Sequence, residues 1–381
     1  MTKIAIAHDW LTNMGGAEKV IINFKQIYKH APIYTISYNE SNLDKDLRDI
    51  DVRTSFIQNL PKGNVKHQMY LPFMPTAWEQ FDFNEYDVVL SSSSSCAKGL
   101  ITSPDTLHIC YCHSPMRYAW EFYNEYMERE NMGKLKKLLI KYIMNYIRIW
   151  DRTSADRVDY YIANSKNVAK RIYKHYGKEA DVIHPPVKGS YFNISDIDED
   201  YFLIVSRLVP YKRIDLAVEV FNELGLPLVI IGGGSQIEYL KSIAKPNVKI
   251  LGRQPDEVIK KYYARCRAFI FPGEEDFGIT PLEAQASGRP VIAFGKGGAL
   301  ETVVNEKTGL FFYEQNIDSL KKSILKFNDI SWNKNGIREH ALKFDEEIFK
   351  MKIEKYVKEK RENHIKKMKE VGIVLKNEFM R

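Results

Sequence analysis

Two glutamates, Glu275 and Glu283, suggest the chemistry of this sequence most directly. They stand with seven residues between them in a stretch that reads Phe-Pro-Gly-Glu-Glu-Asp-Phe-Gly-Ile-Thr-Pro-Leu-Glu from Phe271 onward. This separation does not identify them as a general acid and base pair. Carboxylates in such a loop are suited to accept hydrogen bonds from ligand hydroxyl groups. The alternative is that Glu275 is an exposed loop residue and that Glu283 only completes a helix cap.

The residues between these glutamates predict an anion site. The run 267–271 is expected to form a strand, and a helix is expected to begin at Thr280. Thr280 and Glu283 have the spacing of a capping box, and Pro281 suits the first helical position because it has no N–H to lose. The first-turn amides would then face the loop with partial positive charge, which favours phosphate. A sugar nucleotide offers both hydroxyls and phosphate.

A pair of basic residues and two groups of glycines accompany this loop. Arg207 and Lys212 follow a predicted strand, where Arg can grip a diphosphate with two donors and Lys can supply a point charge. A solvated basic helix start would give the same pattern. Gly232–Gly234 and Gly15-Gly16 allow close backbone approach, or simply a tight turn. Gly15-Gly16 lacks the three spaced glycines of a dinucleotide fingerprint.

Length and composition indicate a soluble globular protein. The 381 residues are enough for two domains, and 44% hydrophobic with 28% charged residues excludes a disordered chain. A net charge of +7 is modest for this length. The four cysteines show neither a disulfide ladder nor a zinc pattern, so reduced thiols are expected. No signal peptide and no membrane span are predicted, and we expect a cytoplasmic protein.

Short β-branched and aromatic runs alternate with helical segments, which favours parallel sheets covered on both faces. The predicted strands are 3–7, 32–37, 51–56, 86–90, 107–112 and 158–163, followed by 201–206, 227–231, 247–251, 267–271, 290–294 and 309–312. The run Ser91–Ser95 is interpreted as a loop at the carboxyl end of the first sheet, where ligands bind in such folds.

Prolines at 185–186 and an acidic stretch at 195–200 mark a domain boundary. We therefore predict an α/β architecture of two Rossmann-like domains, 1–185 and 200–345. A C-terminal helix with a basic tail, 346–381, follows them.

In combination, these motifs resemble glycosyltransferase family 4, a retaining family with the GT-B fold, in which two Rossmann-like domains face each other across a cleft. The resemblance rests on the two glutamates with Phe277-Gly278 between them, Ser206-Arg207-Leu208 with Lys212, and the glycines at 15–16, 232–234 and 297–298. It covers nearly the whole chain and is weakest over 40–83 and after 346. The segments 111–118, 210–217 and 271–278 look like bacterial GDP-mannose-dependent α-mannosyltransferases of surface polysaccharide assembly.

The resemblance implies a role for each motif residue. Arg207 and Lys212 would bind the donor diphosphate and neutralise the leaving group, without a metal ion or another cofactor. Glu283 would bind the ribose hydroxyls, and Glu275 would orient the donor sugar. His113 would face the transferred sugar, although a lone histidine after a strand is more often structural. The remaining donor-site residues would be Gly15, Gly16, Gly233, Phe277, Gly278, Ile279 and Thr280, and the acceptor residues would be Asp9 and Arg117.

The implied reaction is the retaining transfer of mannose from GDP-mannose to a polyprenyl-diphosphate-linked saccharide. The acceptor hydroxyl would attack from the front side, and a phosphate oxygen would take its proton. A UDP-sugar donor and a non-catalytic nucleotide-sugar-binding module are alternatives. Asp196-Ile197-Asp198 matches the metal-binding Asp-x-Asp pair of single-domain glycosyltransferases, but its acidic interdomain setting indicates a solvated linker. A sugar-nucleotide epimerase would lack the paired glutamates.

Two basic segments bear on partners and location. Within 134–152, Leu135, Leu138, Leu139, Tyr142, Ile143, Tyr146 and Trp150 recur at helical spacing with lysines opposite. This pattern fits an interfacial helix on an anionic membrane, or equally a core-facing helix with a solvated basic side. The basic tail over 350–369 would lie on the membrane or pack across the first domain. Either membrane contact would place the protein at the inner face of the plasma membrane. No motif predicts nucleic-acid binding.

Overall fold

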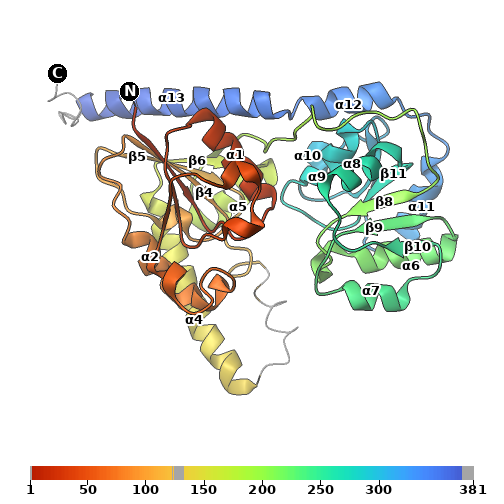
Figure 1. The fold of residues 1–381 in the computed structure, drawn as a ribbon, viewed down its shortest axis with the longest axis horizontal. Coiled ribbons are helices and arrows are strands. Elements are labelled where there is room, and N and C mark those ends of the chain that lie inside the picture. The colour runs from red at the N-terminus through yellow and green to blue at the C-terminus, as the bar shows by residue number, and fades with distance from the viewer. Residues whose placement is uncertain (1, 122, 124–132, 371–381) are drawn as a thin grey trace. The chain divides into compact units, whose positions relative to one another are not determined.

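The structure, a computed structural model, describes residues 2–121, 123 and 133–370 (Figure 1). The chain forms two compact units. The first contains the residues up to Ile183 together with the chain from Lys350 onward, and the second is His184–Phe349. Within the described residues, the chain of the predicted C-terminal segment returns to the first unit at Lys350.

The first unit is built on a seven-stranded parallel sheet of order β3-β2-β1-β4-β5-β6-β7. Its strands are β1 Ile4–His8, β2 Ile33–Thr35, β3 Val52–Thr54, β4 Val88–Ser93, β5 Leu107–Cys112, β6 Tyr160–Ala163 and β7 Ala180–Val182. The strand order changes direction between β1 and β4, which creates a switch point at the carboxyl edge. Ser91–Ser93 belong to β4, so the loop predicted from Ser91 begins later. Strand β7 was not among the strands predicted from the sequence.

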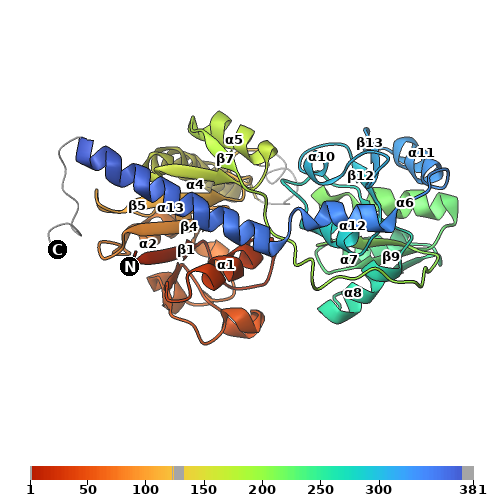
Figure 2. The same cartoon turned by 90° about the horizontal axis from the view of Figure 1, so that it is seen from above.

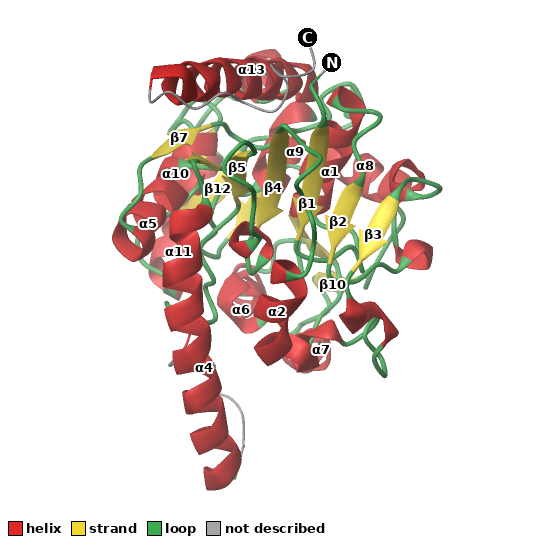
Figure 3. Cartoon of the chain, turned by 90° about the vertical axis from the view of Figure 1, so that its left-hand side faces the viewer, coloured by secondary structure: helices red, strands yellow, loops and turns green. Residues whose placement is uncertain are grey.

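Helices of the first unit are α1 Gly16–Ile27, α2 Met74–Glu79, α4 Lys134–Ser154 and α5 Lys166–Tyr176, and α13 Glu346–Glu370 belongs to it from Lys350 onward. One core cluster joins alternate residues of β1, β2 and β4 to Trp78 of α2 and to Ile147 and Trp150 of α4. A second cluster joins β5 and β6 to α5. Figures 1 and 3 show that the N-terminal half of α4 extends beyond the rest of this unit.

Helix α13 runs along the first unit, as Figure 2 shows. Lys350 donates to Gln26, and the Tyr356 hydroxyl donates to Asp181 at 2.8 Å. Ile353 is fully buried. The described part of the basic tail thus packs on the first unit, which was one of its two predicted positions.

The second unit is built on a six-stranded parallel sheet of order β10-β9-β8-β11-β12-β13. Its strands are β8 Phe202–Val205, β9 Leu228–Ile231, β10 Val248–Ile250, β11 Ala268–Phe271, β12 Val291–Phe294 and β13 Gly309–Phe312. Its helices are α6 Ile214–Leu224, α7 Ile237–Ile243, α8 Asp256–Arg265, α9 Ile279–Ala286, α10 Ala299–Thr302, α11 Ile317–Phe327 and α12 Lys334–Leu342.

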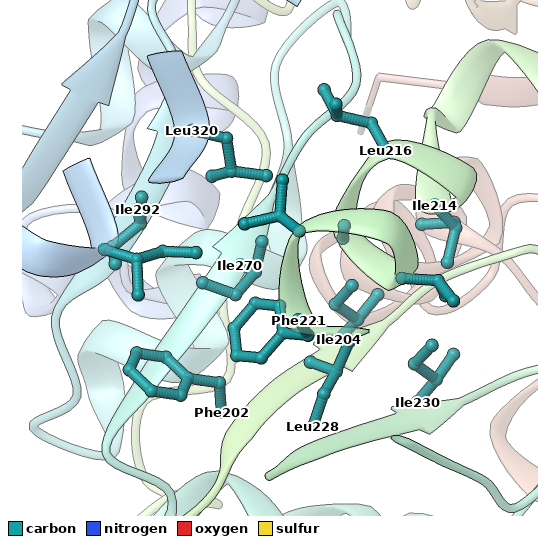
Figure 4. Packing of buried hydrophobic residues seen from close by; sticks show 14 of the residues in the cluster. Phe202, Ile204, Ile214, Leu216, Phe221, Leu228, Ile230, Ile270, Ile292 and Leu320 are labelled. Atoms are coloured by element: carbon teal, nitrogen blue, oxygen red, sulfur yellow. The ribbon is translucent and has the colours of Figure 1, made fainter. Parts of the chain in front are cut away.

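Alternation along these strands creates two cores, one on each sheet face. Phe202, Ile204 and Ile270 pack with Phe221 of α6 and Leu320 of α11 (Figure 4). The intervening strand residues, among them Leu203 and Phe269, pack with α8 and α9. The predicted doubly covered parallel sheets are therefore confirmed.

Two further expectations concern cysteines and membrane spans. All four cysteines are buried and free of disulfides. Among the described residues, no helix combines the length and apolar character needed to cross a bilayer.

Candidate functional site

Lys212 and Glu275 meet in an ion pair between their side-chain ends. Lys212 closes the short 3-10 turn Pro210–Lys212 after β8, and Glu275 lies in the loop after β11. These two strands are hydrogen-bonded neighbours, so their carboxyl ends lie together at one edge. The side chains are only 12% and 19% exposed. The sequence assigned both residues to one ligand but did not predict that they contact each other.

Glycines hold the loop 272–278, called the acidic loop below, close to its neighbours. A Cβ atom on Gly273 would lie 2.9 Å from Lys212 Cα, and one on Gly297 would lie 2.4 Å from the Glu275 carbonyl oxygen. Gly297 also has a φ of +62°, which favours glycine. The Gly298 amide donates to the Glu275 carbonyl at 2.9 Å. The Gly297-Gly298 motif is therefore explained by its support of the loop that carries Glu275.

The helix after this loop begins one residue earlier than predicted, and its cap differs. Helix α9 begins at Ile279, and Gly278 is its N-cap with a φ of +90°. The capping box of Thr280 with Glu283 was wrong, and Pro281 is the third helical residue. The reason is that glycine already supplies the unusual backbone turn required there. Within the described residues no side chain caps α9, so its first-turn amides keep the capacity to bind an anion.

Glu283 is oriented by Tyr263, which was not predicted from the sequence. The Tyr263 hydroxyl in α8 donates to Glu283 Oε2 at 3.0 Å, and the glutamate is only 7% exposed. Burial, and next the charge of Glu283, raise the pKa of Tyr263 well above its usual range, which keeps the phenol protonated as a donor. A tyrosine on the buried face of the preceding helix was the available signal. Ribose binding by Glu283 remains a prediction.

Arg207 is exposed at the carboxyl end of β8, and its guanidinium donates to the Tyr211 hydroxyl at 2.9 Å. The glycine turn after β9 packs against the same strand end. A Cβ atom on Gly232 would lie 1.8 Å from the Ser206 carbonyl oxygen, and one on Gly233 would lie 3.0 Å from Arg253 Nε. Close packing thus explains Gly232, and Arg253 is an additional nearby cation that the motifs did not reveal.

His113 follows β5 in the first unit and is held on three sides. Its Nε2 lies 2.7 Å from Ser92 Oγ, its amide donates to the Ser93 carbonyl, and its own carbonyl accepts from Asn164. Burial, and next the charge of His8, lower the pKa of His113 to about 3. The imidazole is therefore neutral at physiological pH.

Gly15 is the N-cap of α1, where again no side chain of the described residues caps the helix. Gly15 and Gly16 are both exposed, so their backbone is accessible to a ligand. A Cβ atom on Gly15 would lie 2.9 Å from Glu18 Oε2. The glycine therefore also makes room for a buried carboxylate.

Asp9 is 2% exposed, and its carboxylate accepts four hydrogen bonds from the segment that ends β4. The donors are Ser93 Oγ, the Ser94 amide and hydroxyl, and the Ala97 amide, at 2.6–3.2 Å. Asp9 thereby holds the turn after β4. Arg117 is half-buried. Acceptor binding by either residue remains a prediction. The four hydrogen bonds of Asp9 already explain why an aspartate is present at this position.

Asp198 of the Asp-x-Asp sequence is exposed and lies outside any helix or strand, as the solvated-linker prediction expected, but it also has ion-pair partners. It pairs with the buried Arg289 at 2.6 Å and with Lys334 at 2.7 Å. These partners give the carboxylate a structural role. In the part of the chain that the structure describes, no group of three or more His, Cys, Asp or Glu side chains is arranged to hold a metal ion.

Each unit thus brings its predicted residues to the carboxyl edge of its own sheet. In the second unit these are Arg207, Lys212, Gly233, Glu275 and the start of α9. In the first unit they are Asp9, Gly15, Gly16 and His113. This edge is where ligands bind in doubly wound sheets.

Comparisons with known proteins match both halves of the chain. A model described as "Glycosyltransferase Family 4" matches residues 14–188, and one described as "Glycosyl transferases group 1" matches residues 190–347. The alpha-1,3/1,6-mannosyltransferase of Saccharomyces cerevisiae is 24% identical over 80% of this chain and 72% of that protein.

A GDP-mannose-dependent alpha-(1-6)-phosphatidylinositol monomannoside mannosyltransferase of Mycobacterium tuberculosis is 33% identical over 32% of this chain and 36% of that protein. The chain spans between 34% and 50% of the length of three curated relatives, this one included. Among solved structures, HepE of Anabaena in complex with UDP is 17% identical with a TM-score of 0.70, over 94% of this chain and 100% of that one.

Proposed function

We propose that this chain, a glycosyltransferase with family 4 and group 1 domains and the GT-B fold, transfers mannose from GDP-mannose to a hydroxyl of a lipid-linked saccharide. The observation that carries the proposal is the Lys212–Glu275 pair beside the uncapped start of α9. A cation, a carboxylate and helix amides at one strand edge match the charges and hydroxyls of a nucleotide sugar. The names of the yeast and mycobacterial relatives support mannose as the sugar.

The diphosphate would bind Arg207, Lys212 and the first amides of α9. Arg207 offers a planar set of donors and is already steadied by Tyr211. Lys212 contributes a point charge from a largely buried position, where water screens it less than it would at the surface. Glu275 keeps Lys212 in place before the donor binds and can then accept hydroxyls of the sugar.

The chemical step breaks the bond between the sugar C1 and the diphosphate oxygen. Negative charge grows on the leaving diphosphate, and the two cations with the α9 amides stabilise it as it forms. The acceptor hydroxyl attacks the same face of the sugar, and a phosphate oxygen takes its proton, so configuration is retained. This scheme requires neither a metal ion nor a protein nucleophile.

A UDP-sugar donor is the second candidate, because HepE has a related fold and its structure contains UDP. Base and sugar are selected by a few pocket side chains, and these can change while the fold and the diphosphate contacts stay the same. In a third alternative the chain binds a nucleotide sugar without transferring it.

Binding and turnover measurements test these alternatives. The melting temperature is measured with GDP, UDP, ADP and their sugar conjugates, with and without EDTA, and product is then sought with the sugar that binds. Stabilisation by GDP and GDP-mannose that EDTA does not change is the expected result. A preference for UDP would replace the donor, and an EDTA-sensitive shift would contradict the metal-free scheme. Binding without product would support the non-catalytic alternative.

The proposed lipid-linked acceptor would be met at a membrane, and α4 has a surface suited to it. Its apolar residues divide between two faces. Met144, Ile147 and Trp150 are buried in the core, whereas six described residues are 47–82% exposed: Leu135, Leu138, Leu139, Tyr142, Tyr146 and Ile149. The buried face agrees with the prediction of a core-facing helix, and the exposed face supports the membrane-binding alternative as a proposal.

Lysines accompany the exposed face of α4. Lys136 and Lys141 are exposed, and Lys137 is half-buried. Apolar side chains with lysines beside them fit an anionic lipid surface better than a neutral one. We accordingly expect the protein to work at the inner face of the plasma membrane.

Sedimentation with phosphatidylglycerol and phosphatidylcholine vesicles tests this surface. Binding to the anionic vesicles alone is expected, and Leu139→Asp should weaken it at least tenfold by placing a charge among the inserted side chains. Leu325→Asp is the matched control, because Leu325 of α11 is 50% exposed and Leu139 is 59% exposed. Equal binding by both variants would contradict the assignment.

A further inference from the structure

A line of buried polar side chains leads to His113 from the neighbouring strands. Glu18 Oε1 lies 3.6 Å from His8 Nε2, and His8 Nδ1 lies 3.1 Å from both the Ser92 carbonyl oxygen and Ser92 Oγ. Ser92 Oγ in turn lies 2.7 Å from His113 Nε2. His8 and Ser92 are directly paired in the ladder between β1 and β4, which fixes their separation.

The chemistry of these groups determines where the hydrogens are. The Ser92 carbonyl can only accept, so His8 Nδ1 must carry a hydrogen and donate it. The same N–H faces Ser92 Oγ, and the serine therefore accepts from His8 and turns its own hydrogen toward His113. His113 Nε2 is then an acceptor. A neutral imidazole that accepts at Nε2 carries its hydrogen on Nδ1.

We propose that Ser92, with His8 and Glu18 behind it, is a positioning network that fixes His113 in the tautomer that donates a hydrogen bond from Nδ1. In the proposed reaction, on which this role rests, that N–H holds an oxygen of the transferred sugar. His113 is then a donor that orients the sugar, and it does not remove the acceptor proton.

The charges around the network agree with this assignment. Burial lowers the pKa of His8, but Glu18 and Asp9 outweigh it and raise the pKa of His8 overall. A proton is therefore favoured on His8 over His113, and His113 stays neutral. Gly15 contributes by leaving room for the Glu18 carboxylate, which a larger residue would displace.

Nitrogen NMR of the histidine rings tests the network directly. The full-length protein is labelled with ¹⁵N-histidine, and the His113 signals are assigned by comparison with His113→Gln. Wild-type His113 is expected to be neutral at pH 7 with its hydrogen on Nδ1. In Ser92→Ala we expect a mixture of tautomers, together with a fall in kcat of about tenfold, the value of one lost hydrogen bond.

Ser91→Ala is the matched control. Ser91 Oγ makes the same kind of buried contact, at 2.8 Å to His108 Nε2, and strand alternation places it on the opposite sheet face. This variant should leave the His113 signals and kcat unchanged.

The outcomes separate this proposal from the proposed function. A hydrogen on His113 Nε2, a protonated ring at pH 7, or an unchanged tautomer in Ser92→Ala would overturn the network. If the tautomers behave as stated while no nucleotide sugar gives product, the network stands and the transfer reaction fails.

Discussion

Replacement of Lys212 by methionine removes the cation at the centre of the proposed donor site. Methionine keeps most of the apolar length of the side chain, so the change acts mainly on charge. The lost contacts include the ion pair with Glu275 and the position of the ammonium group over the Tyr211 ring, 5.3 Å from its centroid. Glu275, 19% exposed, is left without this partner.

The effect on stability follows from the burial of this pair. Exposed ion pairs contribute about 0–1 kcal/mol, whereas removing one partner of a buried pair costs about 3–5 kcal/mol. Lys212 and Glu275 lie between these limits, at 12% and 19% exposure. We expect Lys212→Met to lower the free energy of unfolding by about 1–2 kcal/mol, which is between the two classes. The fold should persist.

The effect on transfer should be larger than the effect on stability. Removal of one preorganised group that stabilises transition-state charge lowers kcat by about 100- to 1000-fold, or about 3–4 kcal/mol. Lys212 would face the leaving diphosphate from a partly desolvated position, so we expect a loss within this range. Turnover with GDP-mannose and urea unfolding of the same preparation measure the two effects separately.

Lys296→Met provides the matched control. Lys296 pairs with Glu274 of the same acidic loop at 3.1 Å, but the lysine is 62% exposed. Its loss should change unfolding by less than about 1 kcal/mol and transfer by less than about threefold. Wild-type turnover in folded Lys212→Met, or an equal loss in Lys296→Met, would refute the diphosphate assignment. The double variant Lys212→Met/Glu275→Gln should recover stability, because the Glu275 carboxylate that Lys212→Met leaves without this partner is gone. It should not recover activity, because the Lys212 cation is still missing.

Three further predictions concern stability and loop geometry. Burial lowers the pKa of His67 to about 4 and that of His108 to about 3, so the unfolded chain binds protons before the folded protein does as pH falls below 6.5. The stabilisation is therefore full above pH 6.5, and below it the free energy of unfolding falls by about 1.4 kcal/mol per pH unit for each histidine. Between pH 7.5 and pH 5.0, the urea midpoint of His108→Gln should fall less than that of the wild type. Asp151→Asn leaves the buried Lys98 without its 2.7 Å carboxylate partner and should cost about 3–5 kcal/mol in urea unfolding. Gly298→Ala would place a Cβ atom 2.2 Å from the Phe277 Cα atom in the acidic loop. We expect this variant to have a lower melting temperature and no increase in that temperature when GDP is added. Unchanged GDP binding would contradict the role of Gly298 in shaping the donor site.

Much of the architecture could be predicted from the sequence because the relevant patterns are local. Alternating short strands and helices indicated two doubly covered parallel sheets, and both are present. The resemblance to glycosyltransferase family 4 is supported by models that match both halves of the chain. The boundary predicted near the prolines at 185–186 lies close to the division after Ile183.

Details that depend on one or two backbone angles were less predictable. The capping box at Thr280 was a reasonable inference from residue types, but Gly278 adopts a φ of +90° and begins the helix itself. The role of Asp198 depended on Arg289 and Lys334, which are distant in sequence. Sequence spacing carries no information about such partners.

The sequence by itself determined which residues reach the carboxyl edge of each sheet, because strand period and turn glycines place them there regardless of distant contacts. Only the tertiary structure decided which of them touch. Lys212 meets Glu275 because β8 and β11, far apart in the chain, are neighbours in the sheet. Ser92 joins His8 to His113 for the same reason, across β1, β4 and β5. Strand order is set by the packing of the whole core, and a linear pattern of residues does not encode it locally.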